Sequence, residues 1–219
     1  MAQIFPRYAN TLFRLAIVGA ILGAAGIGYA TMVLARSPYF TRAEDAQTQP
    51  IQFSHSHHVN GLGIDCRYCH TAVEEAAHSN VPSTKTCMNC HSQMWVGSKM
   101  LEPVRESFKT GQSIEWKKLH RLADFVYFNH SIHVNKGFGC SACHGRVDHM
   151  QAVFQKGTLL MEWCLECHRY PEKYIRPRDQ IFNMAFKAED LGKTQEQLGK
   201  ELVEKYGVRS LKECSTCHR

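Results

Sequence analysis

The apolar positions of this chain are concentrated in one uninterrupted run near its start. Residues 15–35 read LAIVGAILGAAGIGYATMVLA and carry no charge over 21 positions. That length crosses the hydrocarbon core of a bilayer as a helix, and arginines flank it on both sides. We therefore expect residues 1–36 to form a cytoplasmic N-terminus and a single transmembrane helix. A cleaved signal peptide is the alternative, but the run is longer than the apolar core of such peptides.

Downstream of this run the pattern changes to short polar and apolar stretches with little periodicity. Residues 37–52 are polar, contain two prolines and predict an extended linker. The stretch from Ala188 to Tyr206 has helical spacing. Its expected apolar face consists of Leu191, Leu198, Leu202 and Tyr206. Because no stretch reads as a sheet, the sequence predicts a mainly α fold with much irregular chain over residues 53–219.

Every cysteine of the chain belongs to one motif. The ten cysteines form five copies of C-x-x-C-H. This motif attaches c-type haem, because its two thiols form thioethers to the porphyrin and its histidine binds the iron. The predicted attachment residues are Cys66, Cys69, Cys87, Cys90, Cys140, Cys143, Cys164, Cys167, Cys214 and Cys217. The predicted iron ligands within the motifs are His70, His91, His144, His168 and His218.

Zinc sites and dithiol redox motifs also use C-x-x-C, so one copy alone would leave the chemistry open. Five copies that all end in histidine, with no cysteine left over for a disulfide, favour haem over both. The chain is therefore predicted to carry five covalently bound haem c groups. We expect these macrocycles to form the hydrophobic core of the domain.

A phrase with paired histidines precedes two of the motifs. FSHSHHVNGLGIDCRYCH occupies residues 53–70, and FNHSIHVNKGFGCSACH occupies residues 128–144. Each phrase opens a pair of motifs, so the chain repeats a two-haem unit over residues 53–91 and 128–168. The fifth motif follows alone, in residues 188–219.

Each iron needs a second axial ligand to become a closed, low-spin centre suited to electron transfer. Eight histidines lie outside the motifs, which is more than five irons require. The F-x-H-x-x-H phrase resembles that of small tri- and tetrahaem class III cytochromes c, in which the first histidine caps the haem attached just downstream. This resemblance implies that His55 and His130 cap the haems of the first and third motifs. It also implies that His58 and His133 reach other haems.

The sixth ligand of the fifth haem is chosen from the remaining residues. His120 lies in WKKLHRLADFVYFNH, the segment that approaches the second phrase, and we predict that it is this ligand. Met184 in DQIFNMAF is the alternative, and Met/His ligation would raise the potential of that haem.

The net charge of +6 is changed by the predicted cofactors. Each haem brings two propionates, so a chain loaded with haem is close to neutral. The lysines and arginines therefore suit propionates better than nucleic acid. No basic run interleaved with aromatic residues indicates nucleic-acid binding.

Three long stretches resemble the pentahaem cytochrome subunit of alternative complex III, a membrane quinol:acceptor oxidoreductase. They read FSHSHHVNGLGIDCRYCHTAVEEAAHSNVPSTKTCMNCH, LADFVYFNHSIHVNKGFGCSACHGRV and MEWCLECHRYPEKYIRPRDQIFNM. The resemblance implies an assembly with an iron–sulfur subunit, polytopic membrane subunits and a monohaem cytochrome. It also implies a soluble cytochrome or cupredoxin as the downstream acceptor, in a respiratory or photosynthetic chain.

We therefore predict a membrane-anchored subunit that relays electrons from a quinol-oxidising complex to a periplasmic acceptor and has no substrate site of its own. Haem c is attached outside the cytoplasm, which places the haem domain on the extracytoplasmic side of the cell membrane. A self-sufficient quinol dehydrogenase of the NapC type is the alternative, although such proteins pack four haems close to their anchor. An enzyme of the nitrite-reductase kind needs a haem without a sixth protein ligand, and the spare histidines disfavour it.

Overall fold

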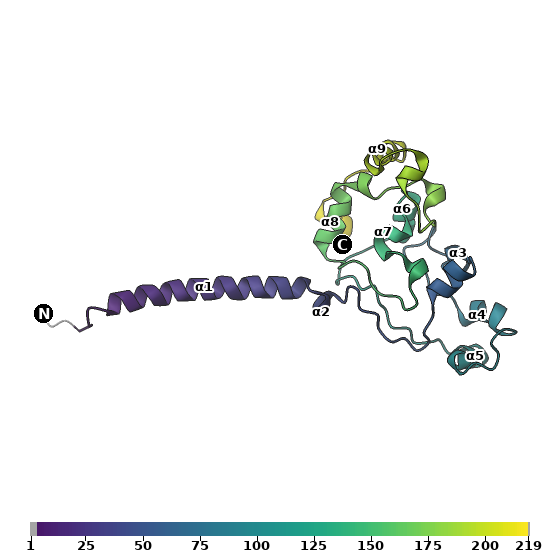
Figure 1. The fold of residues 1–219 in the computed structure, drawn as a ribbon, viewed down its shortest axis with the longest axis horizontal. Helices are drawn as coiled ribbons and strands as arrows, with labels where there is room; N and C mark the ends of the chain where they lie inside the picture. Colours follow the sequence, from purple (N-terminus) through teal and green to yellow (C-terminus); the bar gives the residue numbers. More distant parts are fainter. Residues whose placement is uncertain (1–3, 219) are drawn as a thin grey trace. The chain divides into compact units, whose positions relative to one another are not determined.

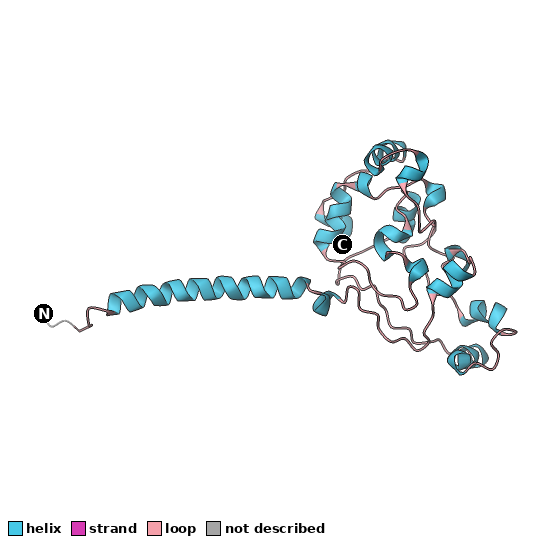
Figure 2. Cartoon of the chain, viewed as in Figure 1, coloured by secondary structure: helices cyan, strands magenta, loops and turns pink. Residues whose placement is uncertain are grey.

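The structure, a computed structural model, describes residues 4–218, and the chain divides into two compact units, residues 1–42 and 43–219. Within the described residues helices alternate with irregular chain, and extended backbone pairs only at isolated bridges (Figure 2). The mainly α fold predicted from the sequence is confirmed.

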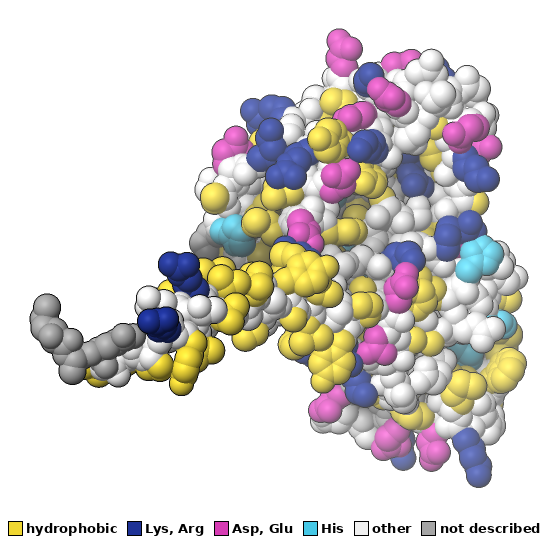
Figure 3. All heavy atoms as spheres, turned by 60° about the vertical axis from the view of Figure 1, so that its left-hand side comes forward, with side chains coloured by type: hydrophobic (Ala, Val, Ile, Leu, Met, Phe, Trp, Pro, Cys, Tyr) yellow, Lys and Arg dark blue, Asp and Glu magenta, His cyan; other side chains and the backbone are white. Residues whose placement is uncertain are grey.

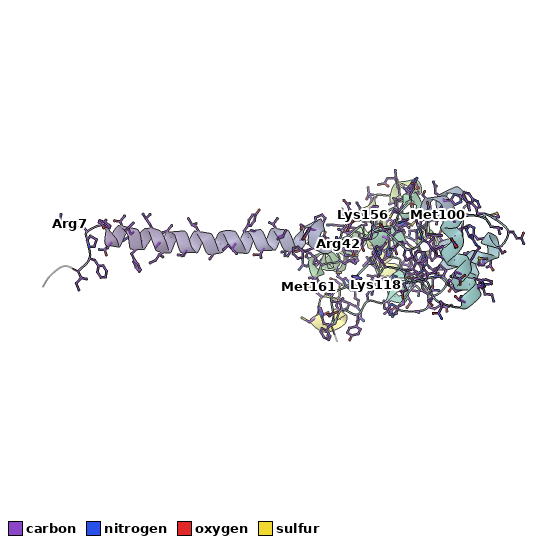
Figure 4. All side chains as sticks on the ribbon, turned by 90° about the horizontal axis from the view of Figure 1, so that it is seen from below. Arg7, Arg42, Met100, Lys118, Lys156 and Met161 are labelled. Carbon is purple, nitrogen blue, oxygen red and sulfur yellow. The ribbon has the colours of Figure 1, made fainter. Side chains whose placement is uncertain are left out.

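The first unit is built on one long helix. Helix α1 (Ala9–Arg36) is continuous over 28 residues and none of them is buried (Figure 1). It is long and apolar enough to cross a membrane, a property it shares with signal sequences near an N-terminus. Arg7 and Arg42 lie beyond its two ends (Figure 4), and apolar side chains cover its surface (Figure 3). A short helix, α2 (Pro38–Thr41), follows within the segment predicted to be a linker.

The helices of the second unit are short because most are single turns around an attachment motif or a histidine phrase. The elements at the phrases and motifs are the π-helical turn η1 (Ser56–Gly61) and helices α3 (Cys66–Cys69), α4 (Thr84–His91), α6 (His130–Asn135), α7 (Cys140–His144), α8 (Met161–Arg169) and α10 (Cys214–Cys217). The remaining elements are helices α5 (Glu102–Thr110) and α9 (Gln195–Lys205) and the 3₁₀ turns η2 (Lys99–Leu101), η3 (Val147–His149), η4 (Pro171–Lys173), η5 (Arg178–Gln180) and η6 (Ala188–Leu191).

The single helix expected between Ala188 and Tyr206 is divided in two. The turn η6 stops at Gly192, whose φ of 68° is left-handed, and α9 starts anew behind Thr194. The Thr194 hydroxyl accepts a hydrogen bond from the backbone N–H of Gln197, which favours a fresh helix start at this point. Leu191 was expected on the buried face but is 52% exposed, because the break separates it from α9.

Helix α9 lies very close to the turn η4. A Cβ atom on Gly199 would come 1.9 Å from the carbonyl oxygen of Glu172, so only glycine allows this approach. Gln195 donates hydrogen bonds to the carbonyls of Glu172 and Ile175, at 3.0 and 2.8 Å. The resulting apolar cluster comprises Ile175, Ala188, Leu198 and Leu202.

Each histidine phrase packs against the other two-haem repeat, on the chain just after the first motif of that repeat. Ser56 in the first phrase donates its N–H to the carbonyl of Met150, at 3.0 Å. Ser131, the equivalent residue of the second phrase, donates to the carbonyl of Ala76, at 3.2 Å. Each acceptor lies six residues after the histidine of its motif, so the two repeats make equivalent contacts. These contacts bring the first and third motifs together.

Few apolar side chains are buried in the second unit. Besides the cluster on α9, the only other apolar cluster among the described residues joins Val73, Val134 and Ile181, with Cys140 and Phe182 against it. Charged side chains of both signs are mixed over its surface (Figure 3). A unit of this length normally buries a much larger polypeptide core. The shortage of core is what a domain organised around macrocycles requires.

Candidate haem-binding sites

Each attachment motif is a helical turn that places its sulfurs and its histidine together. In α3 the backbone N–H of His70 donates to the carbonyl of Cys66, at 2.8 Å, and in α10 His218 donates to Cys214 at the same distance. The Asp65 carboxylate accepts from the N–H of Arg67, at 2.8 Å, and so fixes the start of the first turn. Successive residues of one turn therefore carry both thiols and the ligand.

Two motif histidines face the first histidine of their own phrase. The rings of His55 and His70 lie 6.5 Å apart between centroids and are parallel to within 2°. The rings of His130 and His144 lie 6.3 Å apart, with an interplanar angle of 9°. These are the pairings that the resemblance to class III cytochromes implies for the first and third motifs.

The second histidine of each phrase faces the histidine of the next motif along the chain. His58 lies 6.2 Å from His91, with an interplanar angle of 68°. His133 lies 6.1 Å from His168, with an interplanar angle of 74°. The second and fourth motifs are therefore paired with near-perpendicular rings, whereas the first and third are paired with parallel ones.

The separation within these pairs suits a metal ion between the rings. Metal–imidazole bonds are about 2 Å long, so two imidazoles on opposite sides of one metal have centroids roughly 6 Å apart. The rings are too distant to stack on one another and too close to admit a further side chain. An iron in each of these four gaps would have a histidine on either side.

The phenylalanine that opens each phrase orients both of its histidines. Phe128 stacks on His133 at 4.4 Å and meets His130 edge-on at 4.8 Å. Phe53 packs in the same way on His58, at 4.3 Å, and on His55, at 4.8 Å. The repeated Phe therefore positions two predicted axial ligands at once.

Backbone carbonyls fix the tautomer of most facing histidines. A carbonyl can only accept, so the contacting Nδ1 carries the proton and Nε2 is left free to bind a metal. The Nδ1 atom of His70 donates to the carbonyl of Asn80, at 2.8 Å. Equivalent donors are His58 to Ser54, His91 to Met94, His130 to Ala77 and His133 to Asn129, at 2.8, 3.3, 2.9 and 2.7 Å respectively.

Burial favours the neutral form of His55, His133 and His144, which is the form that binds a metal. Burial, followed by the neighbouring His120 and His130 rings, lowers the pKa of His144 to about 3. Burial also lowers the pKa of His55 to about 4, with an added effect from His70. Burial lowers the pKa of His133 as well.

A buried cation next to the third motif fits the charge of a haem. Arg176 is 9% exposed, and its guanidinium donates to the Ser141 hydroxyl at 2.9 Å and to the Asn183 carbonyl at 3.0 Å. Its Nε has no hydrogen-bond partner among the described residues. A buried charge requires a counter-charge, and haem propionates carry one. No motif or periodic pattern marks Arg176, so its burial was not predicted.

The attachment thiols show which motifs are neighbours. Burial raises the pKa of Cys69, and the Cys87 thiol of the second motif adds to the shift. Burial likewise raises the pKa of Cys140 and Cys143 to about 11 each, with further contributions from Cys66 and Cys164, respectively. The pKa of Cys164 is raised by burial and then by Cys217. The histidine pairs of each phrase join motif two with one and motif three with four, and the Ser56–Met150 and Ser131–Ala76 bonds join one with three. With the fifth motif next to the fourth, the motifs follow one another in the order two, one, three, four, five.

Hydrogen bonds support the two outer steps of this order. Asn89 of the second motif donates to the Tyr68 hydroxyl of the first motif, at 2.9 Å. The hydroxyl of Ser210, just before the fifth motif, donates to the carbonyl of His168, at 2.6 Å. Accordingly, the chain's C-terminal end lies beside α8 (Figure 1).

The fifth motif is held differently from the others. The N–H of Tyr127 donates to the carbonyl of Cys217, at 2.8 Å, and Nδ1 of His218 donates to the carbonyl of Phe125, at 3.2 Å. Within residues 4–218 no histidine ring is found facing His218 as the other motif histidines are faced. Met184, which lies between two phenylalanines packed on the apolar clusters, stays the alternative sixth ligand as a prediction.

His120, predicted as a sixth ligand, lies beside the histidine of the third motif. Its Nε2 lies 3.1 Å from Nδ1 of His144, and the two ring centroids are 4.4 Å apart. His120 therefore contacts the edge of the third motif's ligand instead of facing His218. The segment carrying it runs past α7 before it reaches the fifth motif, a path that residue spacing does not indicate.

Attachment motifs on helical turns, together with histidine pairs separated by a metal-sized gap, define a multihaem cytochrome c domain. Residues 126–219 match the family described as cytochrome c7 and related cytochrome c. The chain is also similar to the multiheme cytochrome c subunit of menaquinone reductase from Nitratidesulfovibrio vulgaris (Hildenborough), with 39% identity over 98 residues. That similarity covers 44% of this chain and 45% of the relative, so the chain spans less than half of the relative's length.

Proposed function

We propose that this protein is a membrane-anchored pentahaem cytochrome c that relays electrons between a quinone-active membrane complex and an acceptor outside the cytoplasm. The observation that carries the proposal is the series of four facing histidine pairs whose motifs adjoin one another. Bound haem c supplies a reversible one-electron carrier. Histidine on both faces leaves these four sites without a position for a substrate.

The order of the motifs gives the relay two ends. The second motif and the fifth motif are terminal, and each has an exposed cysteine, Cys90 and Cys214, respectively. Exposed ends allow a partner's redox centre to approach, whereas the first and third motifs lie in the interior of the series. We assign the two terminal motifs to the exchange of electrons with partners.

We assign α1 to a single-pass anchor in the cell membrane, with the haem domain on the extracytoplasmic side. Its small-residue face includes Gly19 and Gly23, and a Cβ on either would meet no atom within 4 Å beyond the neighbouring backbone of the helix itself. Such a face suits close packing against another transmembrane helix better than it suits a quinol pocket. We therefore assign quinol chemistry to polytopic partner subunits, alongside an iron–sulfur subunit and a monohaem cytochrome as in alternative complex III.

The test compares the isolated, haem-loaded chain with the chain in its native assembly, both purified in mild detergent. Each sample is mixed with menaquinol, and haem reduction is followed by absorbance with and without a quinone-site inhibitor. We expect rapid, inhibitor-sensitive reduction in the assembly only. Rapid, inhibitor-sensitive reduction of the isolated chain would overturn the assignment in favour of a self-sufficient quinol dehydrogenase of the NapC type.

The opposite direction of electron flow is a second candidate. It is favoured by the similarity to a protein named as a menaquinone reductase subunit. In that case a reduced periplasmic cytochrome would reduce the haems, and the assembly would then reduce menaquinone. Mixing the oxidised assembly with a reduced soluble cytochrome and measuring menaquinol formation distinguishes the two directions.

A further inference from the structure

The repeat provides an internal comparison between two nearly identical sites. The first and third motifs both hold parallel histidine pairs, at 6.5 and 6.3 Å. They differ in the atom that accepts the hydrogen bond from Nδ1 of the motif histidine. Nδ1 of His70 donates to the backbone carbonyl of Asn80, at 2.8 Å, whereas Nδ1 of His144 meets Nε2 of His120, at 3.1 Å.

The direction of the His144–His120 hydrogen bond follows from ligation. If His144 binds iron through Nε2, the neutral ring carries its proton on Nδ1 and is the donor. Nε2 of His120 must then be the acceptor, and the proton of His120 is on its own Nδ1. An imidazole nitrogen, with an ordinary pKa of about 6.5, is a far stronger base than an amide oxygen.

Hydrogen bonds of the next residue hold the segment that carries His120. The next residue, Arg121, donates its backbone N–H to the side-chain oxygen of Gln155, at 3.4 Å. Gln155 is 3% exposed, and its amide nitrogen donates to the carbonyl of Gly157, at 2.8 Å. Arg121 also donates from its side chain to the carbonyl of Lys118, at 3.2 Å. The backbone on either side of His120 is therefore tied down, which fixes the ring against His144.

We propose that His120 is a positioning residue that strengthens His144 as an iron ligand and lowers the reduction potential of the third haem below that of the first. A more basic acceptor draws the Nδ1 proton and makes the ligand more electron-rich, which stabilises ferric iron. The third motif is the middle member of the series, so every transferred electron passes its haem. This hydrogen bond therefore sets the reduction potential of that central haem. The inference requires haem at the third motif, but it does not depend on the partner assembly.

The test is equilibrium redox titration of the purified, haem-loaded full-length chain, with absorbance and electron paramagnetic resonance (EPR) as readouts. His120→Leu fills the space without an acceptor, and His120→Gln offers a weaker acceptor. His78→Gln is the matched control, since His78 is an exposed histidine outside the motifs. We expect all haems to stay low-spin in every variant. One midpoint potential should shift to a more positive value in His120→Leu and by less in His120→Gln, with no shift in His78→Gln.

A new high-spin haem, unchanged potentials or a negative shift would overturn the proposal. A new high-spin haem in His120→Leu would identify His120 as an axial ligand. Unchanged potentials, or a shift to a more negative value, would show that His120 does not act as an acceptor toward His144. If His120→Leu does not retain its haems, the comparison of His120→Gln with the wild type decides, since the same direction is expected there. None of these results depends on quinol oxidation, so failure here is separate from failure of the proposed function.

Discussion

Replacing His133 with alanine should open the fourth haem and leave the third haem closed. Although His133 lies only seven residues before Cys140 of the third motif, its ring faces His168 at 6.1 Å. The third motif keeps its own pair, His130 and His144. One haem per chain is therefore expected to become high-spin and to bind carbon monoxide.

The energetic cost can be judged from the contacts that are removed. The His133 ring stacks on Phe128 at 4.4 Å and donates to the Asn129 carbonyl at 2.7 Å. Removal of a half-buried ring with these contacts should lower the free energy of unfolding by about 2–3 kcal/mol, the lower end of the range for large-to-small substitutions. The chain should therefore still fold and mature, and the spectroscopic result should be readable.

The angle between the rings identifies which haem has changed. Parallel imidazoles split the iron d orbitals and give a rhombic EPR spectrum, whereas near-perpendicular rings leave these orbitals nearly degenerate and give a strongly anisotropic signal. The His133–His168 angle is 74°, so His133→Ala should remove one strongly anisotropic signal. His130→Ala, the matched variant, should remove one rhombic signal because its pair is parallel to within 9°. Loss of a rhombic signal in His133→Ala would refute the assigned pairs.

Three further results are expected. The oxidised wild-type protein should show two rhombic and two strongly anisotropic low-spin haems by EPR, and four signals of one kind would contradict the ring angles. Gly199→Ala should lower the free energy of unfolding by about 1–3 kcal/mol in chemical denaturation, because its Cβ would meet the Glu172 carbonyl at 1.9 Å. The control variant Glu204→Ala, at an exposed position of α9, should change the free energy of unfolding little. Equal stability of the Gly199→Ala and Glu204→Ala variants would contradict the close packing. Replacement of residues 1–36 by a cleavable export signal should release the haem-loaded domain from membranes. Continued membrane association of this domain would contradict the assignment of residues 1–36 as the anchor.

The sequence was most informative where the chemistry repeats. A thioether-forming motif has a fixed spacing, so every attachment residue can be named without a structure. The histidine phrase also carries its spacing, and the resemblance to small multihaem cytochromes implied which histidine faces which motif. The mainly α fold followed from the absence of alternating stretches together with the short turns that the motifs impose.

Contacts between backbone atoms leave no pattern in the sequence from which they could be predicted. The exchange between Ser56 and Met150, and between Ser131 and Ala76, uses N–H and C=O groups that every residue possesses. The order of the motifs depends on this exchange, so it could not be predicted from the sequence. The contact between His120 and His144 could not be predicted for a related reason, because an irregular segment held by Gln155 takes a path that periodicity does not record. The helix break at Gly192 was missed because the spacing of leucines continues across it.

The central claim is that one chain carries five covalent haems in one continuous series of neighbouring motifs. A haem count on the mature polypeptide tests it most directly, by the pyridine haemochrome absorbance per mole of purified chain. The five complete motifs predict five haems per polypeptide. A count of four or fewer in fully matured protein would contradict the claim and break the series.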